Sequence, residues 1–130
     1  MKKLFIAACF FSVVLSSCKK ESSPEPPSMI GFWKGKWGNA ANYPSYGYAA
    51  LFRSNGTVRF FDGADTATAS KAEGTYIVSG STVTATYTYT GSSNPISVSA
   101  AVNSKFTFLE GSWGTGGNAT NGGLWILVKQ

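Results

Sequence analysis

The segment Thr82-Val83-Thr84-Ala85-Thr86-Tyr87-Thr88-Tyr89-Thr90 alternates threonine with an apolar or aromatic residue at every step. Successive side chains of a β-strand point to opposite faces, so one face would carry only threonine and the other valine, alanine and tyrosine. Threonine and tyrosine also favour strands, because branched and aromatic side chains pack well on a pleated surface. The segment therefore predicts a half-buried β-strand.

The same two-residue alternation recurs between residues 29 and 130, without a helical apolar period. Asn55-Gly56 lies between two such runs and is a strong hairpin signal, because both residues tolerate a positive φ. We expect eight strands: Ile30–Trp37, Gly47–Arg53, Thr57–Asp62, Gly74–Ser79, Thr82–Thr90, Ile96–Val102, Phe106–Ser112 and Leu124–Lys129. The longer connections, where function is most often found, are Gly38–Ser45, Gly63–Glu73 and Gly114–Gly123.

Sequential strands joined by tight turns predict an all-β domain, an antiparallel up-and-down meander of eight strands. Closing the meander into a small barrel would remove two exposed edges that otherwise promote aggregation. A two-sheet sandwich is the alternative. Barrels of eight strands range from filled with side chains to holding one small molecule.

Composition removes several kinds of active site. The 130 residues contain no histidine and only two cysteines, which excludes a Ser-His-Asp triad, a histidine-ligated zinc site and a Cys-His nucleophile. The four carboxylates of the expected domain, Asp62, Asp65, Glu73 and Glu110, have no spacing that makes a pair converge, as a glycosidase requires. Asp62-Gly63 is typical of a turn, and Asp62 with Asp65 offers too few oxygens for calcium. We expect no catalytic residues, no metal and no cofactor.

The N-terminus is typical of an exported protein. Met1-Lys2-Lys3 precedes an apolar run from Leu4 to Leu15, which is shorter than the ~20 residues that span a bilayer and fits a signal peptide. Leu15-Ser16-Ser17-Cys18 resembles the lipobox of bacterial lipoproteins. The resemblance implies that residues 1–17 are removed and that Cys18 is lipidated. An ordinary cleavable signal with a chance cysteine is the alternative.

Lys19 rather than aspartate follows Cys18, which in Gram-negative lipoproteins implies an outer-membrane location. Lys20-Glu21 resembles the export signal of surface lipoproteins in Bacteroidota, or is simply a solvated linker, so the expected face is periplasmic or extracellular. The lipidated terminus and a linker rich in proline and serine would occupy residues 18–28, and the barrel domain residues 29–130.

Gly31-Phe32-Trp33 opens the first expected strand. This Gly-x-Trp resembles the signature of the lipocalin and avidin superfamily, which implies that Trp33 closes one barrel end and that a basic residue, here Lys129, lies over its ring. Gly74-Thr75-Tyr76 and Gly111-Ser112-Trp113-Gly114 extend the resemblance to small lipocalin-like (calycin-type) lipoproteins of Bacteroidota. The chain is shorter than a full lipocalin and carries no avidin-type ligand set, so neither a large lipophilic pocket nor biotin is implied.

The aromatic residues suggest a ligand site. If Tyr87 and Tyr89 face inward, their hydroxyls need partners inside the barrel, and a small pocket could form between Tyr48, Tyr87, Tyr89 and Trp113. The alternative is a filled barrel with hydrogen-bonded tyrosines. Tyr43-Pro44-Ser45-Tyr46, with Trp37 and Trp113, would either form an aromatic rim for a sugar or protein, or pack the loop against itself.

Asp65-Thr66-Ala67 resembles the O-glycosylation motif of exported Bacteroidota proteins, which marks Thr66 for modification. The basic residues do not cluster as a nucleic-acid site would require; they are Lys34, Lys36, Arg53, Arg59, Lys71, Lys105 and Lys129.

We therefore expect a lipid-anchored, non-enzymatic binding module of the envelope, for a small ligand, glycan or protein and not for nucleic acid. The alternative is a hydrolase inhibitor or protein-interaction module with a filled barrel. An internal cavity above ~300 Å³ would favour the ligand.

Overall fold

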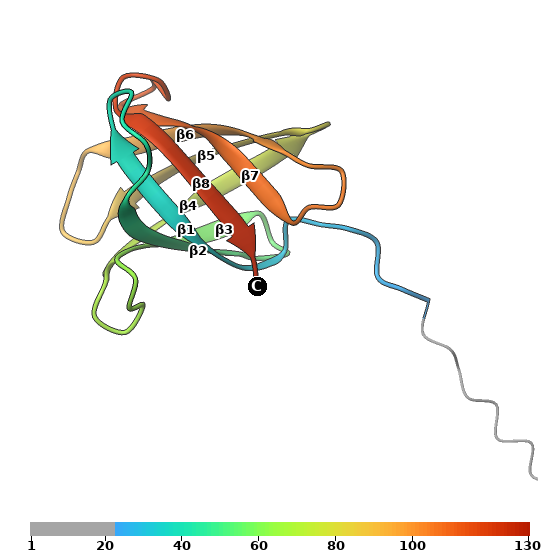
Figure 1. Cartoon of the computed structure of the whole chain (residues 1–130). Coiled ribbons are helices and arrows are strands. Elements are labelled where there is room, and N and C mark those ends of the chain that lie inside the picture. Colours follow the sequence, from blue (N-terminus) through green and yellow to red (C-terminus); the bar gives the residue numbers. More distant parts are fainter. Residues whose placement is uncertain (1–22) are drawn as a thin grey trace, which may run out of the picture.

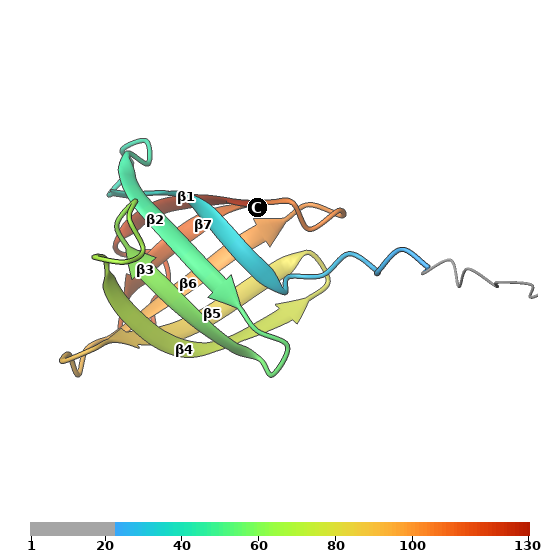
Figure 2. The ribbon, with the colours of Figure 1, turned by 90° about the horizontal axis from the view of Figure 1, so that it is seen from below.

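The computed structural model describes residues 23–130, and the expected signal peptide and Cys18 lie outside the described residues. Within 23–130 the chain forms eight strands and no helix: β1 (Gly31–Asn39), β2 (Tyr46–Phe52), β3 (Thr57–Asp62), β4 (Ser70–Ser79), β5 (Thr82–Tyr89), β6 (Pro95–Val102), β7 (Phe108–Thr115) and β8 (Gly123–Lys129). Each strand pairs antiparallel with the next, and β8 pairs with β1 to close the barrel (Figures 1 and 2). The predicted all-β meander and its closure are confirmed, and the sandwich is not formed.

The strand boundaries differ from the prediction most clearly in β4 and β7, while β7 also extends three residues past the expected Ser112, to Thr115. β4 begins at Ser70, four residues before the expected Gly74, because Ser70 pairs with Asp62 and the fully buried Ala72 belongs to the interior. The polar residues around Ala72 hid this extension, and the connection shrinks to residues 63–69. β7 begins at Phe108 rather than Phe106, because Phe106 has a φ of 52° and belongs to the turn after β6.

The barrel interior is a continuous aromatic and aliphatic core. Phe60 of β3 is fully buried near its centre, with ring centroids of Tyr87 at 4.1 Å, Tyr48 at 5.5 Å and Trp125 at 6.1 Å. Inward-facing residues of all eight strands contribute, since strand alternation places every second side chain inside. Most of the barrel is therefore filled by its own side chains.

One end of the barrel is closed by Trp33 of β1. Its side chain is fully buried, and its indole N–H donates a hydrogen bond to the Met29 carbonyl oxygen at 2.9 Å. Lys129 of β8 places its Nζ atom 6.0 Å from the centroid of the Trp33 ring and donates a hydrogen bond to the Ser28 carbonyl oxygen at 2.7 Å. A Cβ atom at Gly31 would lie 3.1 Å from Cε of Lys129, and Gly31 has a φ of 129°, so glycine suits this contact. Met29 and Lys129 thus both contact Trp33 at this end of the barrel.

The other motif glycines allow neighbouring strands to approach closely. A Cβ atom at Gly74 would lie 2.0 Å from the Thr86 carbonyl oxygen of β5, and one at Gly111 would lie 2.0 Å from the Ser99 carbonyl oxygen of β6. Glycine kinks of this kind let a sheet coil tightly enough to close.

The N-terminal linker leaves the barrel at the closed end. Residues 23–28 lead away from this end, whereas the connections β1–β2, β3–β4 and β5–β6 gather at the opposite, open end (Figure 2).

Candidate binding pocket at the open end

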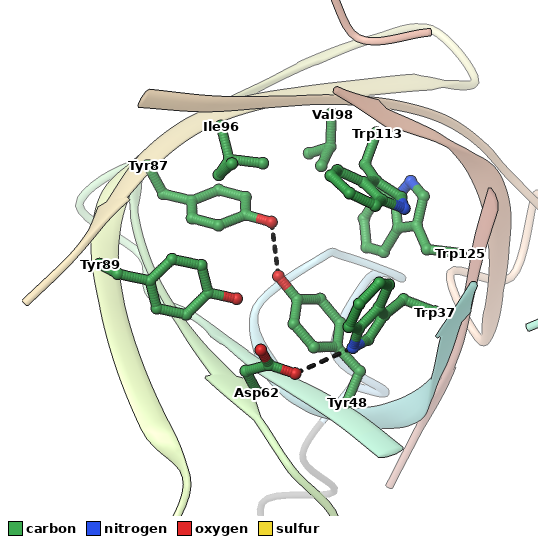
Figure 3. Close-up of a pocket in the computed structure, with 9 residues that line it drawn as sticks. All are labelled: Trp37, Tyr48, Asp62, Tyr87, Tyr89, Ile96, Val98, Trp113 and Trp125. Atoms are coloured by element: carbon green, nitrogen blue, oxygen red, sulfur yellow. Dashed lines mark hydrogen bonds between the residues drawn. The ribbon is translucent and has the colours of Figure 1, made fainter. Parts of the chain in front are cut away.

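A cavity of about 110 Å³ lies at the open end of the barrel, near the ends of β1 and β3. Figure 3 shows the side chains that line it. Its walls are mainly aromatic, with one carboxylate. The lining residues are Trp37, Tyr48, Asp62, Tyr87, Tyr89, Ile96, Val98, Trp113 and Trp125.

All four residues that the sequence suggested for a ligand site line this cavity. Tyr48 comes from β2, Tyr87 and Tyr89 from β5, and Trp113 from β7. Tyr87 and Tyr89 share the inward face of β5 with Val83 and Ala85, as the threonine alternation requires. Strands distant in sequence therefore bring the predicted side chains around one space.

Of the other five lining residues, the sequence interpretation assigned Trp37 to a possible aromatic rim and missed the remaining four, above all Asp62. Asp62-Gly63 was interpreted as a turn, but Asp62 is the last residue of β3. Val58 and Phe60 of β3 face the core, so the alternation places Asp62 on the same inward face. The inward position of Asp62 could have been predicted from this alternation. The residue that contacts Asp62 across the barrel could not have been predicted from the sequence.

Hydrogen bonds hold the lining side chains in place. The Trp37 indole N–H donates to Oδ1 of Asp62 at 2.9 Å, and the Trp113 indole N–H donates to the Gly38 carbonyl oxygen at 3.0 Å. The hydroxyls of Tyr48 and Tyr87 bond to each other at 2.5 Å (Figure 3). Within residues 23–130, no buried side-chain nitrogen or oxygen lacks a partner. The walls are thus preformed.

The three tyrosine hydroxyls of the pocket remain neutral at physiological pH. Burial, followed by the neighbouring Tyr87 and Tyr89, raises the pKa of Tyr48 well above its usual value. Burial also raises the pKa of Tyr87, and burial together with the negative charge of Asp62 raises the pKa of Tyr89 to about 12. Asp62 is therefore the charged side chain of the lining.

The remaining carboxylates of the domain lie away from the cavity. Asp65 accepts hydrogen bonds from the Ala67 backbone N–H at 2.9 Å and the Thr68 hydroxyl at 3.2 Å, within the β3–β4 connection. Glu73 pairs with Arg53 at 3.1 Å and with Arg59. Although desolvation alone would raise the pKa of Glu73, its bonds and charge interactions with these two arginines hold that pKa below its usual value.

Glu110 lines a separate, open groove of about 600 Å³, together with outward-facing residues such as Leu124 and Ile126. In the described part of the chain, no three acidic, cysteine or histidine side chains gather as a metal site would need. The structure therefore brings no second carboxylate of residues 23–130 into the cavity with Asp62.

The aromatic rim is present but incomplete. The Trp37 ring lies 4.9 Å from the Tyr46 ring and 5.4 Å from the Trp113 ring, between centroids, so these three side chains pack together at the mouth. Tyr43 is 78% exposed and lines the outer groove instead. Thr66 lies half-buried in the β3–β4 connection, at the same end of the barrel.

The chain matches no protein-family model, no curated protein and no solved structure. Over residues 23–130 there is no helix of the length and apolar character needed to cross a bilayer.

Proposed function

We propose that this protein is a lipid-anchored, non-enzymatic binding module of the outer membrane, and that its ligand enters the cavity at the open end. The observation that supports this proposal is a preformed pocket of about 110 Å³ whose aromatic walls and single carboxylate converge from six different strands, β1, β2, β3, β5, β7 and β8, with further lining from β6. Preformed, mainly apolar pockets with few polar groups are typical of small-molecule sites.

The volume limits what can enter. Pockets for drug-sized ligands occupy ~300 Å³ or more, and an apolar cavity of ~150 Å³ is large enough for benzene. A pocket of about 110 Å³ therefore suits one small group, either a small molecule or the protruding end of a larger one, and not a large lipophilic molecule. A cavity of this volume is closer to the filled barrel expected for the alternative function than to the large ligand cavity of a lipocalin.

The alternative function, a protein-interaction or inhibitor module, has its own support at the mouth. Tyr46 is 55% exposed and Tyr43 is 78% exposed, and both lie where the connections gather. A partner protein could contact these rings while the pocket took up none of its side chains.

The position of the linker orients the site. Residues 23–28 leave from the closed end, so a lipid on Cys18 would hold that end toward the membrane (Figure 2). An extended linker adds ~3.1 Å per residue, so residues 18–28 would reach about 30 Å. The open pocket would then face away from the bilayer, toward solutes or partners.

A pocket-filling variant tests the ligand-binding function. Ile96→Trp places a larger side chain in the cavity, whereas Leu124→Trp adds the same side chain on the outer face, where Leu124 is 41% exposed. We expect ligand-observed NMR of the full-length protein with a panel of neutral and charged fragments, of up to about six heavy atoms, to detect binders. Ile96→Trp should lower the affinity for these fragments at least tenfold, and Leu124→Trp should leave that affinity unchanged. If no fragment binds the unaltered protein, the ligand-binding function is contradicted and the protein-interaction alternative is favoured.

A second experiment tests the anchor. Cys18→Ala should abolish incorporation of a labelled fatty acid and move the protein from the membrane fraction to the soluble fraction. Cys9→Ala is the matched control, because Cys9 lies in the segment expected to be removed and should leave labelling unchanged. Continued labelling of Cys18→Ala would contradict the anchor.

A further inference from the structure

Asp62 faces the cavity with one oxygen unused. The Trp37 indole N–H occupies Oδ1, but no donor among residues 23–130 reaches Oδ2, and no lysine or arginine in that range pairs with the carboxylate. Asp62 is exposed at the mouth, so water can solvate Oδ2 there. A ligand that fills the pocket displaces some of this water, and it must then supply a compensating charge or donor.

Asp62 lies at one edge of the cavity in the view of Figure 3, and the aromatic rings that line the rest of the cavity have several orientations. The Trp37 and Trp113 rings are perpendicular, with an interplanar angle of 90°, and the Tyr87 and Tyr89 rings meet at 79° with centroids 5.9 Å apart. The face of an aromatic ring carries negative electrostatic potential and attracts cations. Because the tyrosine hydroxyls stay neutral, the rings and Asp62 together give the cavity a negative potential with mainly apolar walls.

The composition of the connections at the open end also favours a negative electrostatic potential there. Residues 40–45, 63–69, 90–94 and 116–122 contain no lysine or arginine and one carboxylate, Asp65. The strand ends beside these connections add Asp62 and Lys71, and the Lys71 Nζ donates a hydrogen bond to the Ala67 carbonyl oxygen at 3.4 Å. The opposite, closed end carries Lys105, Lys129 and Arg53, of which Arg53 pairs with Glu73. An excess positive charge on the whole chain, +5, therefore coexists with a negative pocket mouth. Such a mouth attracts cations and repels anions.

We propose that the pocket binds a methylated ammonium group, with Asp62 as its counter-ion and the rings of Trp37, Trp113 and the pocket tyrosines as its cage. This inference rests on the proposed ligand-binding function and names the class of ligand. The volume of about 110 Å³ equals roughly four waters at ~30 Å³ each, which suits a trimethylammonium group.

The mainly aromatic walls favour a methylated ammonium group over an unmethylated one, because they offer few hydrogen-bond acceptors. An unmethylated ammonium has three N–H donors, each of which needs an acceptor once water is displaced. Here Oδ2 of Asp62 is the free charged acceptor, the Tyr48 and Tyr87 hydroxyls bond to each other, and the Tyr89 hydroxyl adds one neutral acceptor, which is fewer strong acceptors than three N–H donors need. A trimethylammonium group has no N–H to satisfy and keeps its full charge, so the aromatic cage suits it better.

Three probes of nearly the same skeleton test the inference on the full-length protein. They are choline, its uncharged isostere in which carbon replaces nitrogen, and ethanolamine, which lacks the methyl groups. We expect choline to shift the Trp37 indole N–H resonance and to bind at least tenfold more tightly than either of the others. Equal affinities for choline and its isostere would overturn the role of charge, and equal affinities for choline and ethanolamine would overturn the role of the methyl groups.

Asp62→Asn removes the charge and retains an oxygen that can accept the Trp37 hydrogen bond. This variant should lower the affinity for choline at least tenfold and leave the affinity for the isostere unchanged. Asp65→Asn is the matched control, because it removes a carboxylate at the same end and outside the cavity, and it should change choline affinity less than twofold. Thermal unfolding of both variants checks that the barrel is intact.

The outcomes separate this inference from the function on which it rests. If neutral fragments of the panel bind and Ile96→Trp excludes them, but choline does not bind, the cation site is overturned and the ligand pocket stands. If no fragment and no probe binds, both fall. Vesicles distinguish two sources of the same group: co-sedimentation of Cys18→Ala with phosphatidylcholine but not phosphatidylglycerol vesicles would indicate a lipid headgroup, and choline binding without co-sedimentation would indicate a free small molecule.

Discussion

Replacing Trp33 with alanine is expected to lower the free energy of unfolding by about 3 to 5 kcal/mol, the usual cost of removing a fully buried tryptophan. Trp33 has no exposed surface, and its ring lies 6.0 Å from the Phe52 ring at a T-shaped angle of 74°. The substitution also leaves the Met29 carbonyl without its 2.9 Å hydrogen bond and Lys129 without a ring beneath it. A domain of this size is stable by only ~5 to 15 kcal/mol, so the loss is a large fraction.

Urea denaturation measures this change as a shift of the midpoint at constant slope. Tyr43→Ala is the control, because that ring is 78% exposed and its loss should change stability by no more than about 0.5 kcal/mol. A loss below 1 kcal/mol for Trp33→Ala would mean that the indole does not close the barrel. The closed end would then have to be held by the other side chains around it.

The sequence predicted the barrel well because its evidence is local. Strand alternation in 82–90 and Asn55-Gly56 each act over a few residues, and closure follows from the need to pair both edges. The boundaries failed where tertiary packing outweighs local pattern. Ala72 is drawn into the core between polar neighbours, and Phe106 adopts a positive φ that few large residues adopt.

The candidate site was predictable only in part, for a related reason. The inward tyrosines of β5 follow from parity within one strand. The pairing of Tyr48 with Tyr87 joins β2 to β5, which are not neighbours in the barrel, so it depends on how the interior is filled. The role of Asp62 required knowing that the Trp37 N–H stands opposite it, a contact between residues 25 positions apart.

Gly74→Ala is expected to destabilise the protein by about 1 to 3 kcal/mol or more, as overpacking does. The added Cβ would lie 2.0 Å from the Thr86 carbonyl oxygen and 2.6 Å from Cα of Tyr87. Both atoms belong to the backbone of β5, so no side chain can rotate away. Relief requires β4 and β5 to separate where Gly74 pairs with Tyr87, inside a ladder that runs from Ala72 to Ser79.

Gly117→Ala is the matched control. No atom lies within 4 Å of a Cβ built at Gly117, and this residue is not among those with a positive φ. Alanine there should be neutral or stabilise slightly, because it reduces the freedom of the unfolded chain. Equal unfolding midpoints for the two variants would contradict close strand contact at Gly74.

The same substitution connects the barrel wall to the pocket. Tyr87 supplies both the backbone that Gly74 approaches and the hydroxyl that bonds to Tyr48 at 2.5 Å. A shift of Tyr87 should therefore disturb the Tyr48 and Tyr89 ring resonances in Gly74→Ala, under conditions where the barrel is still folded. Gly117→Ala should leave these resonances in place. If Gly74→Ala lost stability without moving them, the strain would be absorbed within β4, and the pocket would be independent of the glycine that shapes the wall behind it.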